Sequence, residues 1–104
     1  MNRTEILHKA NEYITRDRQA THGEAENSFA DIASLWSAYL HKEINPRDVA
    51  MMMVMLKIVR YKKNPTHIDN AIDLCGYAAI AGELGMGALA VSYTHLTLPT
   101  ILLV

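Results

Sequence analysis

Residues 45–61 constrain the fold more than any other part of the chain. Asn45 and Asp48 have the spacing of a capping box, and Pro46 stands at the first helical position. In the segment that follows, 49–61, only two residues carry a charge, and apolar side chains point in every direction around the axis. A helix that is apolar on every side is buried on every side. We therefore predict a helix that lies at the centre of the domain or at an interface between two copies.

Self-association is the simpler way to bury this helix. Three neighbouring helices barely cover it in a domain that we expect to span residues 1–90. Contact with a second copy would bury Met51, Val54 and Met55. The expected state is therefore a homo-oligomer, and a dimer in particular.

Apolar residues recur at helical spacing in three further segments, 3–15, 24–41 and 67–84. A polar connection, 15–23, separates the first two. The core face of the second segment is expected to consist of Phe29, Ile32, Ala33, Trp36, Tyr39 and Leu40. No period typical of a strand occurs before residue 91. The prediction is an all-α, four-helix bundle-like domain.

Local signals mark both ends of the last segment. Thr66 stands three residues before Asp69, which resembles a capping box. Gly85 and Gly87 are expected to end the helix. We therefore expect the fourth helix to be confined to residues 67–84.

The composition excludes several classes of protein. The chain has 104 residues, and ten Lys and Arg oppose eleven Asp and Glu, which gives a net charge of -1. Without a basic excess, a nucleic-acid binder that relies on phosphate contacts is not expected. The single cysteine cannot form an internal disulfide. The N-terminus lacks the apolar region of a secretory signal, and no segment is apolar enough to cross a membrane.

The last residues differ in character from the rest. Residues 84–104 carry no charge, and 91–104 are rich in Thr and β-branched residues without a helical period. Residues 91–100 resemble one translated reading frame of a transposon-end adapter used to prepare sequencing libraries. We expect 91–104 to be an irregular tail that is foreign to the natural chain or disordered. A hydrophobic C-terminal strand is the alternative.

Two carboxylates mark the fourth helix as the candidate site. Asp69 and Asp73 are one turn apart on a segment that is otherwise almost uncharged. Carboxylates this close repel each other and require a cation. The preceding helix supplies Lys57 and Arg60, which a short antiparallel turn would bring opposite the aspartates. Either these four residues form a structural salt-bridge cluster, or the aspartates hold Mg²⁺ while the basic residues hold phosphate oxygens.

The second helix and the residues before it offer further ligands. Glu24 and Asn27 share a stripe and carry oxygen atoms suited to a hard cation such as Mg²⁺. Arg18 and His22 precede this helix and are candidates for binding an anion at its start. The alternative is an ordinary solvated helix start, where acidic residues complement the helix dipole.

Several of these residues recur in a known family. The pieces are Arg18-x-x-x-His22-Gly23, Glu26-Asn27-x-Phe29, Ile32-Ala33-x-Leu35-Trp36-x-x-Tyr39-Leu40, Asp48-Val49-Ala50, Lys57-Ile58-x-Arg60 and Asp69-Asn70-x-x-Asp73-x-x-Gly76-Tyr77. In order and spacing they resemble a family of small helical phage and prophage proteins of unknown function. The resemblance covers about residues 5–85, and many members carry Tyr where this chain has His22. It implies a protein of the cytoplasm of a bacterial host cell.

A weaker resemblance concerns the acidic residues alone. They are similar to the all-α nucleoside triphosphate pyrophosphatases of the MazG kind, which carry ExxE on one helix and ExxD on a later one. Here the two motifs become Glu24-x-x-Asn27 and Asp69-x-x-x-Asp73, so this chain has fewer metal carboxylates than that family uses. The resemblance implies a Mg²⁺-dependent dimer or tetramer with a nucleotide ligand. The alternative hypothesis is a non-catalytic interaction module with a structural charge cluster.

Overall fold

Four helices make up the described part of the chain. The computed structural model describes the backbone of residues 1–21 and 24–92 and the side chains of residues 1–16 and 28–86. In chain order the helices are α1 (Arg3–Thr21), α2 (Glu24–Leu40), α3 (Pro46–Lys63) and α4 (Ile68–Ser92). These ranges contain no strand, so the all-α prediction is confirmed. Among them no helix is long and apolar enough to cross a membrane.

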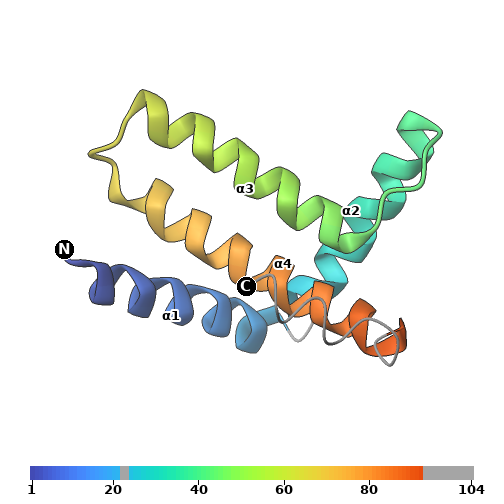
Figure 1. Ribbon diagram of the computed structural model, residues 1–104, viewed down its shortest axis with the longest axis horizontal. Coiled ribbons are helices and arrows are strands. Elements are labelled where there is room, and N and C mark those ends of the chain that lie inside the picture. Colours follow the sequence, from blue (N-terminus) through green and yellow to red (C-terminus); the bar gives the residue numbers. More distant parts are fainter. Residues whose placement is uncertain (22–23, 93–104) are drawn as a thin grey trace.

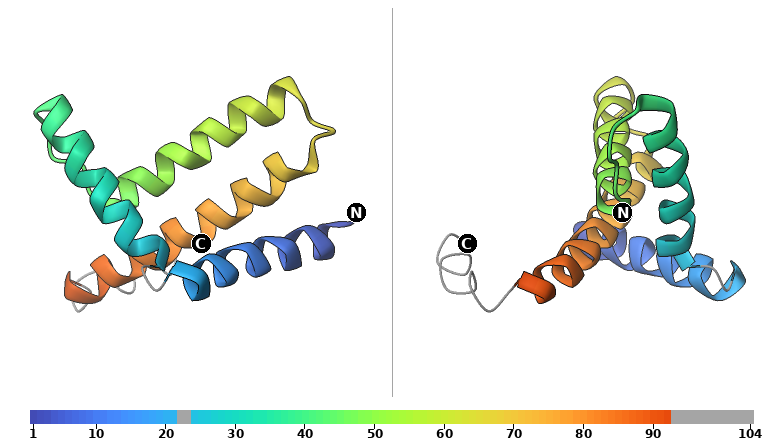
Figure 2. Two further views of the ribbon diagram at one scale, coloured as in Figure 1. Left: turned by 180° about the vertical axis from the view of Figure 1, so that it is seen from behind. Right: turned by 90° about the vertical axis from the view of Figure 1, so that its right-hand side faces the viewer.

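The helices are arranged around a hairpin of α3 and α4. These two helices run antiparallel, and α1 lies along α4 in the same direction as α4 (Figure 1). α2 crosses the start of α3, and its C-terminal end projects away from the hairpin (Figure 2). α4 therefore lies between α1 on one side and α3 on the other.

The start of α3 follows the local sequence signal. Asn45 is the N-cap; its side-chain oxygen accepts a hydrogen bond from the Asp48 backbone amide at 2.8 Å. The Asp48 carboxylate accepts one from the Asn45 amide at 3.0 Å, which completes the capping box. The connection before it is fixed by Ser37, whose hydroxyl accepts from the Ile44 amide at 2.8 Å and donates to the Ile44 carbonyl at 3.1 Å. His41 makes the turn with a left-handed φ of 54°.

The core lies where α2, α3 and α4 meet. Its buried members are Phe29, Ala33, Val49, Ala50 and Ala81, of which Val49 and Ala50 are fully buried. Small residues at three of these positions allow the helix backbones to approach closely. The rings of Phe29 and Tyr77 lie 6.2 Å apart between centroids and link α2 to α4.

α1 packs against α4 at a glycine. A Cβ atom added at Gly76 would lie 3.3 Å from Cγ2 of Ile14. Because Gly76 has no side chain, Ile14 of α1 can pack directly against the backbone of α4 at this point. Ala10 on α1 and Ile72 on α4 are also buried.

Two of the expected helix boundaries are wrong. α1 does not end at residue 15 but continues to Thr21, because the polar residues that follow include no breaker before Gly23. α4 does not end at Gly85 or Gly87 but continues to Ser92. An interior glycine costs a helix only about 1 kcal/mol, which neighbouring turns offset. Residues 93–104, most of the expected irregular tail, lie outside the described residues.

The expected cap of α4 is also wrong. The Thr66 hydroxyl donates to the side-chain oxygen of Asn64 at 3.1 Å instead of capping the helix. The α4 helix begins at Ile68, two residues later.

The apolar faces of α2 and α3 are less buried than predicted. Tyr39 and Leu40 are exposed because the C-terminal end of α2 has left the hairpin. On α3 only Val49, Ala50 and Val54 are buried, although the sequence predicts burial on every side. Within one chain, therefore, α3 has a packed inner side and an open apolar outer side.

Candidate functional site

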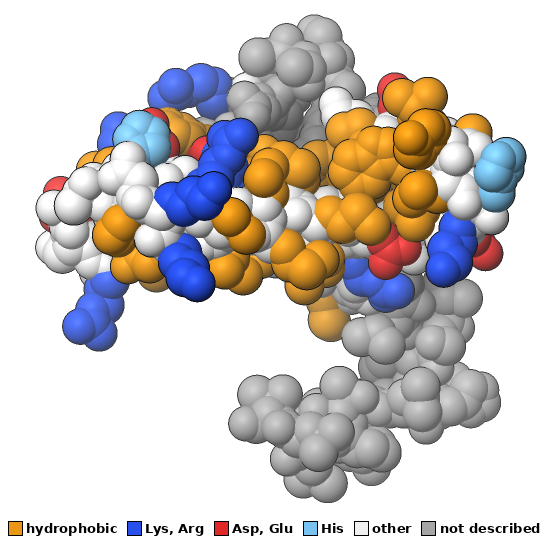
Figure 3. Space-filling view, turned by 90° about the horizontal axis from the view of Figure 1, so that it is seen from above, with side chains coloured by type: hydrophobic (Ala, Val, Ile, Leu, Met, Phe, Trp, Pro, Cys, Tyr) orange, Lys and Arg blue, Asp and Glu red, His pale blue; other side chains and the backbone are white. Residues whose placement is uncertain are grey.

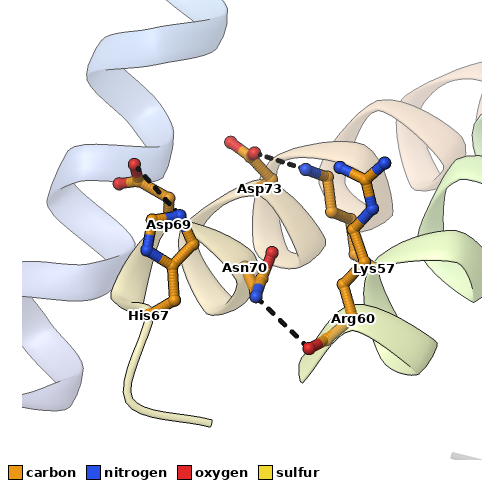
Figure 4. A network of polar contacts seen from close by, with 6 residues as sticks. All are labelled: Lys57, Arg60, His67, Asp69, Asn70 and Asp73. Carbon is orange, nitrogen blue, oxygen red and sulfur yellow. Dashed lines mark hydrogen bonds and ion pairs between the residues drawn. The ribbon is translucent and has the colours of Figure 1, made fainter. Parts of the chain in front are cut away.

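The site predicted from the sequence lies on the α3–α4 hairpin. Nζ of Lys57 is 2.9 Å from Oδ2 of Asp73, an ion pair between the facing sides of the two helices (Figure 4). The side chains are 13% and 32% exposed, respectively. The expected juxtaposition of these two residues is thus present, and it follows from the short antiparallel turn. Partial burial makes such a pair stronger than one in full contact with water.

Asp69 lies one turn before Asp73 but does not share its cation. Among the described residues, the basic group that contacts Asp69 is the His67 imidazole, whose Nε2 lies 3.9 Å from Oδ2. The Asp69 side chain is 54% exposed. Asp69 and Asp73 are therefore on one face in different surroundings: Asp73 is held against α3, and Asp69 is open to solvent.

Arg60 is opposite α4 but forms no ion pair with a described residue. Its side chain extends to the same side of the hairpin as Lys57 (Figure 4). Its backbone carbonyl accepts a long hydrogen bond, 3.4 Å, from Nδ2 of Asn70. The guanidinium group is therefore available to an anionic ligand next to the Lys57–Asp73 pair.

Asn70 is a residue that the sequence reasoning missed. It is the one buried polar side chain among the described residues, and it connects the first turn of α4 to the end of α3. No local pattern in the sequence indicates its burial, because Asn70 follows the polar Asp69 in the same turn. Its contact with a backbone carbonyl indicates that it fixes the spacing of the two helices at the site.

The remaining predicted ligands lie outside the described side chains. They are Glu24 and Asn27 for the metal, and Arg18 and His22 for phosphate. Within the described ranges, no three His, Cys, Asp or Glu residues are grouped closely enough to hold a metal ion. The roles of these four residues, and of magnesium itself, stay predictions.

The described geometry supports two kinds of chemistry. The first is structural: the partly buried Lys57–Asp73 ion pair links α3 to α4. Next to it, the Asp69 carboxylate and the Arg60 guanidinium present opposite charges to solvent on neighbouring helices. Such a site can accept a hard cation on one side and phosphate oxygens on the other.

Comparison with known proteins identifies relatives in phages. The Gene 55 protein of Mycobacterium phage L5 is 42% identical over 80 residues, which cover 76% of this chain and 51% of the relative. The Gene 55 protein of Mycobacterium phage D29 is 42% identical over 73 residues, or 70% of this chain and 48% of the relative. The chain thus spans about half the length of the curated relatives that it matches.

A family model matches residues 5–85, which include both Asp69 and Asp73 on α4 and the whole of α3. No solved structure matches the chain. The family expected from the sequence, one of helical phage proteins of unknown function, is confirmed. The chain belongs to the family described as a domain of unknown function (DUF6378).

Proposed function

We propose that the α3–α4 hairpin of this phage-type protein forms a nucleotide-phosphate pocket. In the proposal, Asp69 and Asp73 hold Mg²⁺, and Lys57 and Arg60 contact phosphate oxygens. Glu24 and Asn27 complete the metal ligands, and Arg18 and His22 extend the phosphate contacts. With a nucleotide substrate, the proposed location is the cytoplasm of the bacterial host cell.

The unequal surroundings of the two aspartates carry this proposal. Asp73 has a cation at 2.9 Å, whereas Asp69 is more than half exposed and has only the His67 imidazole at 3.9 Å. A purely structural cluster would be expected to neutralise both carboxylates. A divalent cation between Asp69 and Asp73 would remove their mutual repulsion and make use of the exposed carboxylate.

The acidic motifs suggest the reaction. By their resemblance to MazG-like enzymes, the proposed activity is hydrolysis of a nucleoside triphosphate to a monophosphate and pyrophosphate. Water attacks the α-phosphorus. The bond between the α-phosphorus and the oxygen that bridges it to the β-phosphorus breaks, and pyrophosphate leaves. Mg²⁺ would supply an activated water and charge neutralisation. Lys57 and Arg60 would bind the oxygens on which negative charge accumulates.

A screen for pyrophosphate release tests this proposal. The full chain is incubated with a panel of nucleoside and deoxynucleoside triphosphates, with and without Mg²⁺. We expect release from at least one of them only with Mg²⁺, and a loss of about 100-fold or more in Asp69→Asn. The matched control is Glu43→Gln, an exposed acid in the connection before α3 that should retain full activity. Equal activity of Asp69→Asn and the wild type would contradict the proposal.

A second function has its own supporting observation. The Lys57–Asp73 pair is partly buried and joins the two helices of the hairpin through a side chain of α3, as a purely structural cluster would. On this alternative the protein is a non-catalytic interaction module. It predicts no pyrophosphate release from any triphosphate, and no effect of Mg²⁺ on stability.

A further inference from the structure

The outer side of α3 carries several exposed apolar side chains. We define the outer strip as Met51, Met55, Ile58 and Val59, whose exposed fractions lie between 45% and 53%. Steps of three and four residues place them on one face of the helix. Figure 3, which views the molecule from the α3 side, shows hydrophobic side chains gathered along this helix and toward α2. A surface of this kind on one helix is typical of an interaction site.

This strip is separate from the candidate site. The inner side of α3 is covered by the chain itself. It includes Lys57, whose side chain is 13% exposed, and Val54, which is 8% exposed. Val54, expected from the sequence to contact a second copy, therefore does not belong to the outer strip. A partner on the strip would leave the Lys57–Asp73 pair unobstructed, so the inference does not rest on the proposed function.

Charges at the two ends of the strip indicate its occupant. Asp48 precedes the strip by three residues, and Lys62 follows Ile58 by four, so both continue the same stripe. The first turn of α3 carries the acid Asp48, while the neighbouring Arg47 side chain lies near Gly85 of α4, and the last turn is basic, with Arg60, Lys62 and Lys63. A helix with opposite charges at its two ends is complementary to a reversed copy of itself.

We propose that the outer strip binds a second copy of this chain, with the two α3 helices antiparallel and crossing near Met55. This pairing brings Asp48 of each copy beside Lys62 of the other and Met51 beside Val59. A parallel pairing would place Lys62 and Lys63 against the same residues of the second copy, and like charges would repel. The pairing has two-fold symmetry, so the outer strip of one copy contacts the outer strip of the other.

The size of the strip sets the expected affinity. α3 has 18 residues and is about 27 Å long. A single helix face buries less than the roughly 800 Å² per partner of a standard interface. We therefore expect a dimer that forms at micromolar concentration and dissociates on dilution.

Sedimentation tests whether the strip is the interface. At 50–100 μM, on the order expected for such an interface, the full chain should sediment as a dimer. Met55→Glu should be monomeric with unchanged helical circular dichroism. The matched control Leu7→Glu places the same charge on an exposed apolar residue of α1 and should remain dimeric. A wild-type monomer would overturn the proposal, whether the strip stays open or residues 93–104 of the same chain cover it. A dimeric Met55→Glu would overturn it as well.

Disulfide cross-linking tests the orientation. The experiment uses a Cys75→Ala background, because Cys75 is a free cysteine. Oxidation of a mixture of Met51→Cys and Val59→Cys proteins should yield mainly the mixed 51–59 dimer. Met51→Cys alone should cross-link poorly, because the antiparallel pairing separates the two residues by about 12 Å along the axis. Efficient 51–51 cross-linking would indicate parallel helices and overturn the proposed orientation.

The charge pattern offers an independent check. Lys62→Glu would place an acid beside Asp48 of the second copy and should weaken the dimer about tenfold or more. Lys42→Glu makes the same change in the turn after α2, away from the strip, and should leave the dissociation constant unchanged. Equal effects of the two variants would show that the net charge of the protein controls association. That result would overturn the proposed antiparallel pairing.

Discussion

The inner and outer sides of α3 have similar compositions but different surroundings. Val49, Ala50 and Val54 on the inner side are buried against α2 and α4, whereas Met51 and Met55 on the outer side are about half exposed. The only charged side chain well covered on the inner side, Lys57, has a carboxylate partner at 2.9 Å. The comparison shows that hydrophobicity alone does not decide which side of a helix is buried. The positions of the other three helices decide it.

The largest expected effect contrasts a buried and an exposed position on α3. Val49→Asp places an unpaired carboxylate at a fully buried site and should destabilise the fold by about 4 kcal/mol or more. Met51→Asp, two residues later on the outer strip, should cost the monomer about 0.5 kcal/mol or less. Urea unfolding at low protein concentration measures both. Equal losses would contradict the assignment of inner and outer sides.

The next effect concerns the ion pair on the inner side. Asp73→Asn leaves the Lys57 ammonium without its partner and should lower the free energy of unfolding by about 1–3 kcal/mol. The control is Lys57→Met combined with Asp73→Asn, which removes both charges of the pair. This double variant should recover part of the loss, because no unpaired charge remains. Additive losses would mean that the two side chains do not interact in solution.

The smallest effect distinguishes two sides of α4. Gly82→Ala meets no atom within 4 Å and should stabilise the protein by about 0.5–1 kcal/mol through helix propensity. Gly76→Ala brings a methyl group to 3.3 Å from Ile14 and should gain less than Gly82→Ala, or lose stability. Thermal melting of the two variants gives the comparison. A larger gain at Gly76 would indicate that α1 is only loosely packed on α4.

Local signals explain which parts of the fold could be predicted. The capping box of Asn45 and Asp48 acts within four residues, so the start of α3 was predictable from sequence. The short connection between α3 and α4 likewise made the approach of Lys57 to Asp73 predictable. Both features depend on neighbours in the chain and not on the tertiary arrangement.

Other features depend on the tertiary arrangement, and the sequence did not contain them. The exposure of Tyr39 follows from the direction in which α2 leaves the hairpin, which no local pattern specifies. The buried role of Asn70 depends on where the end of α3 lies. The different surroundings of Asp69 and Asp73 could not be predicted either, because both occupy the same face of one helix.

Asp69 offers the most direct test of the candidate site, because its exposed side chain has little structural role. In metal-free buffer Asp69→Asn should melt within about 2 °C of the wild type, as expected of a surface substitution. If the aspartates hold Mg²⁺, the melting temperature of the wild type should rise by about 5 °C or more at ten times the dissociation constant. Asp69→Asn should lose this rise, and Glu43→Gln should keep it.

The decisive measurement is therefore the magnesium dependence of the melting temperature of wild type and Asp69→Asn. The proposed pocket predicts a rise in the wild type that the variant lacks, although both melt alike without metal. Melting temperatures that magnesium leaves unchanged in both proteins would contradict a metal site on α4. The Lys57–Asp73 pair would then be a structural contact, and the interaction-module function would replace the nucleotide pocket.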